Sequence, residues 1–368
     1  MKIGVLTSSR ADYGIYLSLL VELKKNSLIE LDIIAFGTHL SKEHGYTIED
    51  IIKDEYKTIH KVCSLGKDDS EEGIAISYGN TVIKFSRFWS NHNFDLVFCL
   101  GDRYEMSAAV QASIPFGIKL AHIHGGETTL GAIDNIFRHQ ITLASKLHFV
   151  STKYHKLMVE KLIGQSDNIF NVGSLSLTNL DNFKPLSRPS FLKKYNIKKE
   201  PFALVTFHPE TVDPKKNIAF SFVVKSTLAE LSKKINVVVT MPNADTLGTH
   251  FRNQLINLKK NNPKKVVLVE NFGKKNYFSA MFYSSILIGN TSSGIIEAAS
   301  FGKYFVNVGD RQKGRSQSKN IFNTTFNKDD ILNKTKLALR RGYYNGDNVY
   351  FQKNCLKNIT ETIVNDGT

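Results

Sequence analysis

The sequence predicts an α/β protein of two doubly wound domains, each with a parallel β-sheet covered by helices on both faces. Short apolar runs alternate with longer amphipathic stretches throughout the 368 residues. A chain of this length is long for one hydrophobic core and suits two. Apolar runs of three to six residues between helical patterns are typical of βαβ units with buried strands.

Two series of apolar runs are expected to form the strands, one series in each half of the chain. The second series starts afresh at Phe202, after a stretch without strand signals. The expected strands are Ile3–Leu6, Leu31–Phe36, Leu96–Leu100, Ile118–His122, Leu147–Val150, Phe202–Phe207, Asn236–Thr240, Val266–Val269, Ile286–Ile288 and Tyr304–Val308.

The boundary between the domains is placed in a polar segment that contains Pro185 and Pro189. The first domain is therefore expected over residues 1–181 and the second over residues 190–347. The last segment, residues 348–368, is expected to be a helix that packs back on the first domain. Tandem doubly wound domains are expected to face a cleft at the carboxyl ends of their strands, where such sheets bind ligands.

Charge is distributed unevenly along the chain. Residues 1–184 carry 19 Lys and Arg against 21 Asp and Glu, whereas residues 185–368 carry 29 against 13. A basic half suits an enzyme that holds an anionic ligand in one domain. The lysines form scattered pairs without a recognised motif, which argues against a nucleic-acid partner. No apolar run approaches a signal peptide or a span of about 20 residues, so we expect a cytoplasmic protein with no membrane partner.

The most informative segment, residues 289–297, follows one of the expected strands. Its Gly, Ser and Thr residues precede a helical pattern, and the N–H groups and dipole of a helix start attract anions. Glu297 is expected about one turn inside that helix, where it could accept hydrogen bonds from a ribose diol. The pairing favours a nucleotide, although a Ser-rich cap without a ligand gives a similar pattern.

Polar side chains also follow strands of the first domain. Arg10, after the first strand, is placed to meet a diphosphate; alternatively it lies on the surface while Asp12 caps the helix. The same loop is not a GxGxxG fingerprint, which argues against a dinucleotide cofactor. Asp102 beside Arg103 suits acid–base chemistry or a helix cap.

Two histidines, His122 and His124, stand in alternating register and are expected to point the same way, with Glu127 nearby. A metal site is not favoured, because no third ligand has diagnostic spacing. Asp134 either takes part in the chemistry or simply starts the helix that carries Arg138.

In the second domain, His208 follows a strand and precedes Pro209, which is expected to hold it in an extended turn. Asn243 follows the next strand of that domain. Both positions lie where ligands bind in parallel sheets.

In this order and spacing, these residues resemble the hydrolysing UDP-N-acetylglucosamine 2-epimerases, enzymes of sialic-acid-type sugar synthesis. The resemblance covers most of the chain. It rests on residues 9–14, 101–103, 122–127, 133–134, 138–139, 208–209, 242–245, 289–294 with Glu297, and 309–315.

The resemblance implies a GT-B-like fold, no cofactor or metal, a UDP-sugar as the small-molecule partner, and a homodimer or homotetramer. It also implies two groups of site residues. Asp102, Glu127 and Asp134 match positions around the sugar, and the positions that hold UDP are matched by Arg10, His208, Asn243, Thr291, Ser292, Glu297 and Arg311.

One departure concerns the catalytic acids: many relatives have His-x-Glu where this chain has His122-Ile123-His124. The base and the acid therefore stay open among Asp102, His124, Glu127 and Asp134. Our hypothesis gives those roles to Asp102 and Asp134, with Glu127 and His124 positioning the sugar or water.

The implied reaction converts UDP-N-acetylglucosamine and water to N-acetylmannosamine and UDP through a glycal. One alternative is the same reaction on UDP-2,4-diacetamido-2,4,6-trideoxyglucose. Others are a non-hydrolysing epimerase, a GT-B glycosyltransferase and a UDP-sugar-binding protein without catalysis.

Overall fold

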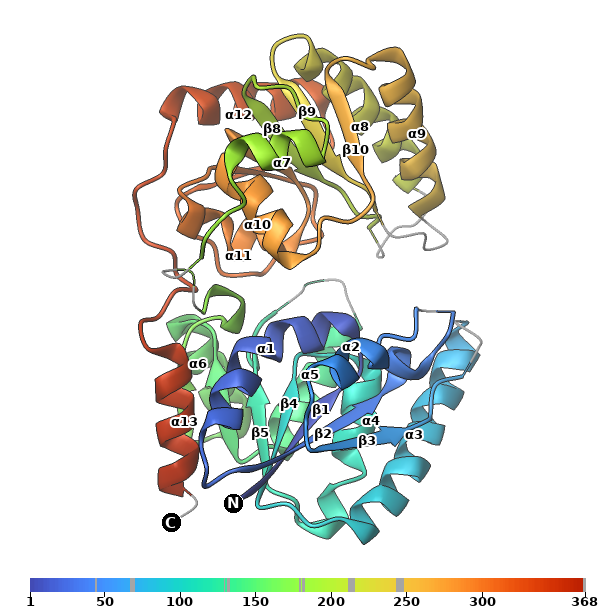
Figure 1. Ribbon diagram of the computed structural model, residues 1–368, viewed down its shortest axis with the longest axis vertical. Helices are drawn as coiled ribbons and strands as arrows, with labels where there is room; N and C mark the ends of the chain where they lie inside the picture. Colours follow the sequence, from blue (N-terminus) through green and yellow to red (C-terminus); the bar gives the residue numbers. More distant parts are fainter. Residues whose placement is uncertain are drawn as a thin grey trace. The chain divides into compact units, whose positions relative to one another are not determined.

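The computed structural model describes residues 1–43, 45–66, 70–128, 130, 133–178, 180, 183–210, 216–242 and 248–366. The chain forms two compact units, each with its own parallel sheet (Figure 1). The first unit comprises Met1–Glu127, Ile133–Thr178 and Tyr350–Thr368, and the second comprises Thr128–Ala132 and Asn179–Val349. The predicted fold class, two doubly wound α/β domains, is confirmed.

The first unit has a seven-stranded sheet in the order β3-β2-β1-β4-β5-β6-β7. The order reverses between β1 and β4, the switch point at which doubly wound sheets bind ligands. The strands are β1 (Lys2–Thr7), β2 (Glu30–Phe36), β3 (Thr58–Val62), β4 (Leu96–Leu100), β5 (Leu120–Ile123), β6 (Leu147–Val150) and β7 (Ile169–Asn171). The helices are α1 (Arg10–Lys25), α2 (Ile48–Lys53), α3 (Glu71–Asn91), α4 (Tyr104–Gln111), α5 (Asp134–Ala144), α6 (Lys153–Ile163) and α13 (Cys355–Asp366), with 3-10 turns η1 (Gly37–Leu40), η2 (Ile114–Phe116) and η3 (Leu175–Leu177).

The second unit has a six-stranded sheet in the order β10-β9-β8-β11-β12-β13, with its switch point between β8 and β11. The strands are β8 (Phe202–Thr206), β9 (Asn236–Thr240), β10 (Val266–Val269), β11 (Ile286–Gly289), β12 (Phe305–Val308) and β13 (Ile321–Thr324). The helices are α7 (Arg188–Lys194), α8 (Asn217–Ser232), α9 (Gly248–Asn261), α10 (Lys274–Tyr283), α11 (Ser292–Ile296) and α12 (Lys328–Arg341), with a 3-10 turn η6 (Ala298–Phe301).

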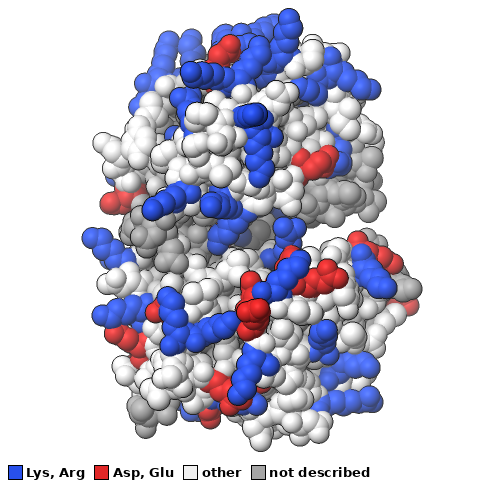
Figure 2. All heavy atoms as spheres, in the orientation of Figure 1, with Lys and Arg blue, Asp and Glu red and all other residues white. Residues whose placement is uncertain are grey.

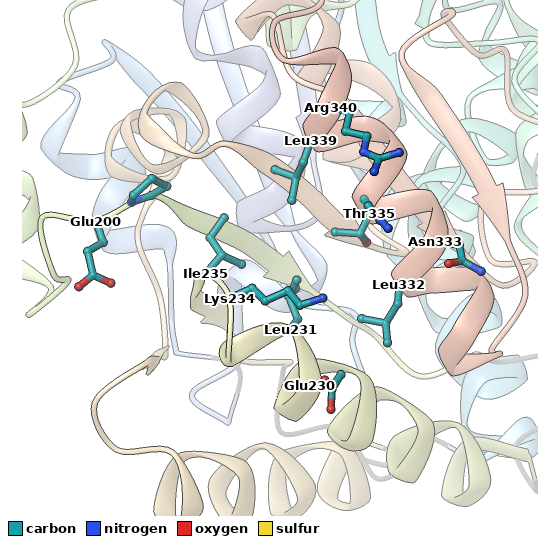
Figure 3. A pocket seen from close by; sticks show the side chains of 12 residues that line it. Glu200, Glu230, Leu231, Lys234, Ile235, Leu332, Asn333, Thr335, Leu339 and Arg340 are labelled. Atoms are coloured by element: carbon teal, nitrogen blue, oxygen red, sulfur yellow. The ribbon is translucent and has the colours of Figure 1, made fainter.

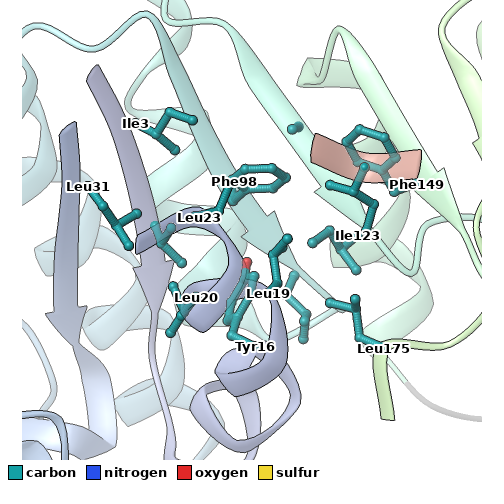
Figure 4. Close-up of a cluster of buried hydrophobic side chains, with 14 of the residues drawn as sticks. Ile3, Tyr16, Leu19, Leu20, Leu23, Leu31, Phe98, Ile123, Phe149 and Leu175 are labelled. Carbon is teal, nitrogen blue, oxygen red and sulfur yellow. The ribbon is translucent and has the colours of Figure 1, made fainter. Parts of the chain in front are cut away.

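The core of the first unit explains why its central strands are apolar on both faces. On one face, Phe98 and Phe149 pack with Leu19 and Leu23 of α1 (Figure 4). Ile359 of α13 belongs to the same cluster, which ties the C-terminal helix to the first sheet. Burying such faces is the dominant favourable contribution to folding.

Three strands were not predicted, and all three lie at the edge of a sheet. β3 and β7 are edge strands of the first sheet, and β13 is an edge strand of the second. Their residues are mostly half-exposed, and polar residues such as Lys61 and Asn323 interrupt the apolar pattern. An edge strand needs no continuous apolar run, so a search for such runs misses it.

Two predicted starts were wrong by two residues or more, whereas the other strand boundaries differ from the prediction by at most one residue. Strand β5 starts at Leu120 and not at Ile118, because Gly117 adopts a left-handed conformation that ends η2 just before it. The C-terminal helix starts at Cys355 and not at residue 348. The residues before it form turns and irregular backbone, with Asn354 at a positive φ of 59°, and Tyr350 accepts a backbone hydrogen bond of 2.8 Å from Ser174 N–H, beyond the end of β7.

None of the described helices combines the length and the apolar character that a bilayer span requires.

Candidate functional site

In the second unit, an amide side chain holds the turn after β8. Asn290, at the end of β11, accepts a 2.8 Å hydrogen bond from the backbone N–H of His208 and donates one of 2.8 Å to its carbonyl. The two turns meet because β8 and β11 are parallel neighbours, with Gly289 in register with Thr206. Asn290 is fully buried, so the backbone of His208 is held from a rigid position.

The imidazole of His208 is kept neutral. Burial, assisted by the positive charge of Arg311, lowers its pKa to about 4. A neutral imidazole offers one N–H donor and one acceptor nitrogen near pH 7. His208 can therefore hydrogen-bond a ligand without adding a positive charge of its own.

A third turn, after β12, joins this arrangement. Arg311 and Gln312 both donate to the carbonyl oxygen of Asn290, at 3.4 Å and 2.9 Å. Glu210 accepts a 2.8 Å hydrogen bond from the backbone N–H of Asp310. The turns after β8, β11 and β12 thus form one connected network, with an arginine beside it to meet an anion.

The segment after β11 differs from the expected helix. Thr291 is the N-cap, α11 has only five residues, and Glu297 is its C-cap, followed by the turn η6. The dipole of so short a helix is small, so an anion here would depend mainly on local N–H groups and on Arg311. Ser292 is the first residue of α11.

Gly289 permits the close approach of β11 to β8. A Cβ at this glycine would lie 1.8 Å from the carbonyl oxygen of Thr206, and its φ of 147° suits few other residues. Any larger residue would push apart the two turns that Asn290 joins.

Helix α10 contributes two residues that the sequence did not single out. Burial lowers the pKa of Lys274, while the charge of Glu297 acts in the opposite direction. Tyr277 has a raised pKa because it is buried, and its hydroxyl interacts with Ser293 and Thr206. Their only signal in the sequence was a helical pattern before β11. Asn243, the remaining candidate of this unit, lies outside the described residues.

In the first unit, the turn after β1 is a capping arrangement. Ser9 is the N-cap of α1 and accepts a hydrogen bond of 3.3 Å from Asp12 N–H. Asp12 in turn accepts from the hydroxyl of Ser8, at 2.6 Å, and burial raises its pKa. The cap is therefore Ser9, and Asp12 reaches back to the N–H and hydroxyl of Ser8, one residue before the N-cap whose N–H a capping box would use. Arg10, the first residue of α1, is exposed.

A buried arginine organises the acidic residues of this unit. Arg138 of α5 forms an ion pair with Asp102 and also donates to the carbonyl of Glu127. Its side chain is only 2% exposed. Asp102 is not a helix cap, because the N-cap of α4 is Arg103. The loops after β4 and β5 are thus joined through α5.

Asp134 lies one helical turn before Arg138 and is the first residue of α5. Burial raises its pKa, and the negative charge of Asp102 raises it further, against the opposing charges of Arg138 and Arg103. A carboxyl group with a raised pKa suits a proton donor near neutral pH.

The carboxylate of Glu127 accepts from a serine, which in turn bonds a histidine. Ser151 Oγ donates to Glu127 Oε1 at 2.9 Å and lies 2.9 Å from His155 Nδ1. Because the hydroxyl has one proton, which goes to Glu127, Nδ1 of His155 is the donor in the second bond. Neither residue was predicted, although Ser151 directly follows β6, as strand-end site residues do.

The two histidines do not share a direction. His122, the residue before the last of β5, lies 2.9 Å from the Gly101 carbonyl, and burial lowers its pKa to about 3. His124 has a positive φ of 65°, which ends the strand alternation, and its Nε2 accepts from Leu175 N–H at 3.4 Å. In the described part of the chain, no three His, Cys, Asp or Glu side chains converge as metal ligands would.

Comparisons with known proteins agree with these features. A family model described as UDP-N-acetylglucosamine 2-epimerase matches residues 21–364. The GDP/UDP-N,N'-diacetylbacillosamine 2-epimerase (hydrolyzing) of Campylobacter jejuni is 35% identical over 89% of this chain and 85% of its own. The polysialic acid biosynthesis protein P7 of Escherichia coli is 31% identical, over 98% of this chain and 93% of its own.

A solved structure shares the fold. The UDP-GlcNAc 2-epimerase from Neisseria meningitidis, bound to UDP-GlcNAc, matches with a TM-score of 0.81 and 16% identity, over 99% of this chain and 100% of that one. The extent of the family match, together with relatives above 30% identity, confirms the resemblance seen in the sequence. The chain belongs to the UDP-N-acetylglucosamine 2-epimerase family.

Proposed function

We propose that this chain is a hydrolysing 2-epimerase of a UDP-linked 2-acetamido sugar. The observation that carries the proposal is the group formed by Asp102, Glu127 and Asp134 around the buried Arg138. Inverting C2 of the sugar requires one group to remove a proton and another to deliver one to the opposite face. Three carboxyl groups on one scaffold supply candidates for both tasks.

The reaction has two balanced steps. In the first, a base takes the C2 proton, the C1–O bond breaks, and UDP leaves with the bonding electrons, which gives a glycal. In the second, water adds its hydroxyl to C1 and a proton reaches C2 on the other face. The products are the free C2-epimer and UDP.

Within the first unit, we assign the base to Asp102 and the proton donor to Asp134. Burial and the nearby charge of Asp102 raise the pKa of Asp134, which favours its protonated form. Glu127, held by Ser151, positions the sugar or water, together with His124.

In the second unit, we assign the binding of UDP to the connected turns. Arg311 and the N–H groups at Thr291 and Ser292 suit the diphosphate, and Glu297 suits the ribose diol. His208, neutral and held by Asn290, donates to the leaving diphosphate. Asn243 and Arg10 complete the proposed UDP-binding group by family resemblance.

Two sugars are candidates. The family description favours UDP-N-acetylglucosamine, with N-acetylmannosamine as the product. The Campylobacter relative, whose name gives GDP/UDP-N,N'-diacetylbacillosamine, supports the second candidate, UDP-2,4-diacetamido-2,4,6-trideoxyglucose. We further propose a homodimer or homotetramer.

The test is UDP release from each of the two UDP-sugars, followed by chromatography of the sugar product. The proposal expects UDP and a free 2-epimer in equal amounts from one of them. Asp134→Asn should slow release by at least about 10²-fold, the usual contribution of a general acid or base. The exposed Asp167 provides a matched control, and Asp167→Asn should leave the rate unchanged. A UDP-linked epimer, or no release from either sugar, would contradict the proposal.

A further inference from the structure

A cavity of about 770 Å³ lies at the end of the second sheet opposite the turns that hold His208 and Asn290 (Figure 3). Pro201 and Ile235, which line it, directly precede β8 and β9, whereas His208 follows the carboxyl end of β8. A five-residue strand spans about 16 Å. The cavity is therefore separate from the turns to which we assign UDP, and its size is in the range of small-molecule sites.

The floor of this cavity is apolar. Leu231 and Ile235, from the end of α8 and the loop after it, are 5% and 8% exposed. Leu332 and Leu339 of α12 line the other side (Figure 3). Such a surface takes the apolar part of a ligand.

The rim of the cavity carries three cations, Lys234, Lys336 and Arg340. In the described part of the chain, none of the three forms an ion pair with a carboxylate. Lys336 and Arg340 are four residues apart on α12 and so lie on one face of the helix. Figure 2 shows Lys and Arg side chains gathered over the upper end of the second unit, with few acidic ones.

Two carboxylates also line the cavity, but each is paired with a lysine that does not line it. Glu200 is bonded to Lys265, and Glu230 lies 2.7 Å from Lys233. The paired carboxylates leave the rim with an excess of positive charge. The rim therefore favours an anion over a cation or a neutral molecule.

A polar atom without a partner points to a ligand independently of the charges. Thr335 is 2% exposed and lines the cavity, and its hydroxyl has no hydrogen-bond partner among the described residues. Buried polar atoms are satisfied in the great majority of cases, so an exception calls for an explanation. A polar group of a bound molecule would provide the missing partner.

We propose that this cavity binds a small soluble amphipathic anion. The apolar body of the ligand packs on Leu231, Ile235 and the leucines of α12. Its phosphate, sulfonate or carboxylate group lies against Lys336 and Arg340 and hydrogen-bonds to the hydroxyl of Thr335. The inference does not depend on the proposed epimerase activity.

The test uses 8-anilinonaphthalene-1-sulfonate, a fluorescent amphipathic anion, in equilibrium titrations of the full chain. Lys336→Glu and Arg340→Glu should each raise its Kd about tenfold. Lys260→Glu, on the exposed face of α9, makes the same change in net charge outside the cavity and should leave the Kd unchanged. The Kd of the uncharged probe N-phenyl-1-naphthylamine should change less than twofold in any of the three charge variants.

A second variant tests the hydroxyl. Thr335→Val keeps the shape of the side chain, so circular dichroism and thermal unfolding should show an intact fold, while the Kd of the probe should rise about threefold. The proposal is overturned if the probe does not bind saturably, if all three charge variants change its Kd equally, or if Thr335→Val leaves the Kd unchanged.

Discussion

Asn290 binds both hydrogen-bonding groups of the His208 backbone, so a side chain at the end of β11 substitutes for the partners that β8 loses where the sheet ends. The two contacts, each of 2.8 Å, join turns that are 82 residues apart in the chain. The carbonyl of Asn290 is itself held by Gln312. The position of His208 therefore depends on two other turns and not on its own loop alone.

Replacing Asn290 by Ala should displace His208 more than it destabilises the fold. We expect kcat for UDP release to fall about 10²-fold, because small displacements of a reacting group cost that much. The loss of unfolding free energy should be about 1–3 kcal/mol. The control is Asn307→Ala, which removes a buried amide on β12 that donates to Asn323 at 2.9 Å. Equal loss of kcat in the two variants would refute a specific role for Asn290.

Replacing Arg138 by Leu should destabilise the first unit, because Asp102 would lose this ion-pair partner and the carbonyl of Glu127 would lose a buried donor. Because the arginine is buried while the Asp102 side chain is 27% exposed, the loss of unfolding free energy should be about 1–3 kcal/mol, measurable by urea unfolding. Arg252→Leu removes an arginine that forks onto the exposed carboxylate of Glu270, at 2.8 Å and 3.0 Å, and should cost about 1 kcal/mol or less. Similar losses would mean that Arg138 does not organise the acidic group.

Ser151 and Thr152 are neighbours with different partners, which separates stability from catalysis. Thr152 caps α6 by accepting from His155 N–H at 3.1 Å, whereas Ser151 donates to Glu127. Either residue changed to Ala should lower the unfolding free energy by about 1 kcal/mol. Only Ser151→Ala should also slow UDP release, by about tenfold, since the carboxylate of Glu127 loses the hydrogen bond from Ser151. A slow Thr152→Ala variant would show that the effect comes through α6.

The stability of the protein should fall as the pH is lowered from about 6.5 to about 4. Burial lowers the pKa of His39, His148 and His208 to about 4 and that of His122 to about 3. In that window the unfolded chain binds protons that the folded chain does not, so the unfolding free energy rises with pH, by up to about 1.4 kcal/mol per pH unit for each histidine.

His148→Phe isolates one part of this dependence. The raised pKa values of Asp12 and Asp134 make the unfolding free energy fall as the pH rises, which opposes the effect of the histidines. The slope measured for the wild type is therefore the sum of both effects. His148 is fully buried, and removing it should lower the slope of the unfolding free energy against pH between pH 4.5 and 6. The expected decrease corresponds to the binding of about one proton and is measured by urea titrations at several pH values. An unchanged slope would show that His148 does not titrate in this way.

Much of the fold could be predicted because buried parallel strands are continuous apolar runs. β4, β6, β9 and β10 begin and end at the predicted residues. The edge strand β3 could not be found in this way, because solvent at the border of a sheet tolerates polar residues. The helix after β11 was expected to continue past Glu297, but α11 ends at Ile296. The apolar pattern misleads here because it continues into the 3-10 turn η6.

The candidate site was predictable where residues follow strands, but not in its pairings. Asp102 and Arg138 are 36 residues apart, and no local pattern shows that they meet across α5. The positive φ of His124 could not be predicted either, because the alternation of a strand predicts the direction of a side chain only while the strand continues. Contacts between residues so far apart in the chain can be identified only once the packing of the helices on the sheet is known.

The central claim is that the chain inverts C2 and releases UDP. The most direct measurement is proton NMR of the purified protein with each UDP-sugar in D2O. We predict a free 2-epimer that carries deuterium at C2, with UDP accumulating in equal amount. A free sugar that keeps its C2 proton, or an epimer still linked to UDP, would contradict the account.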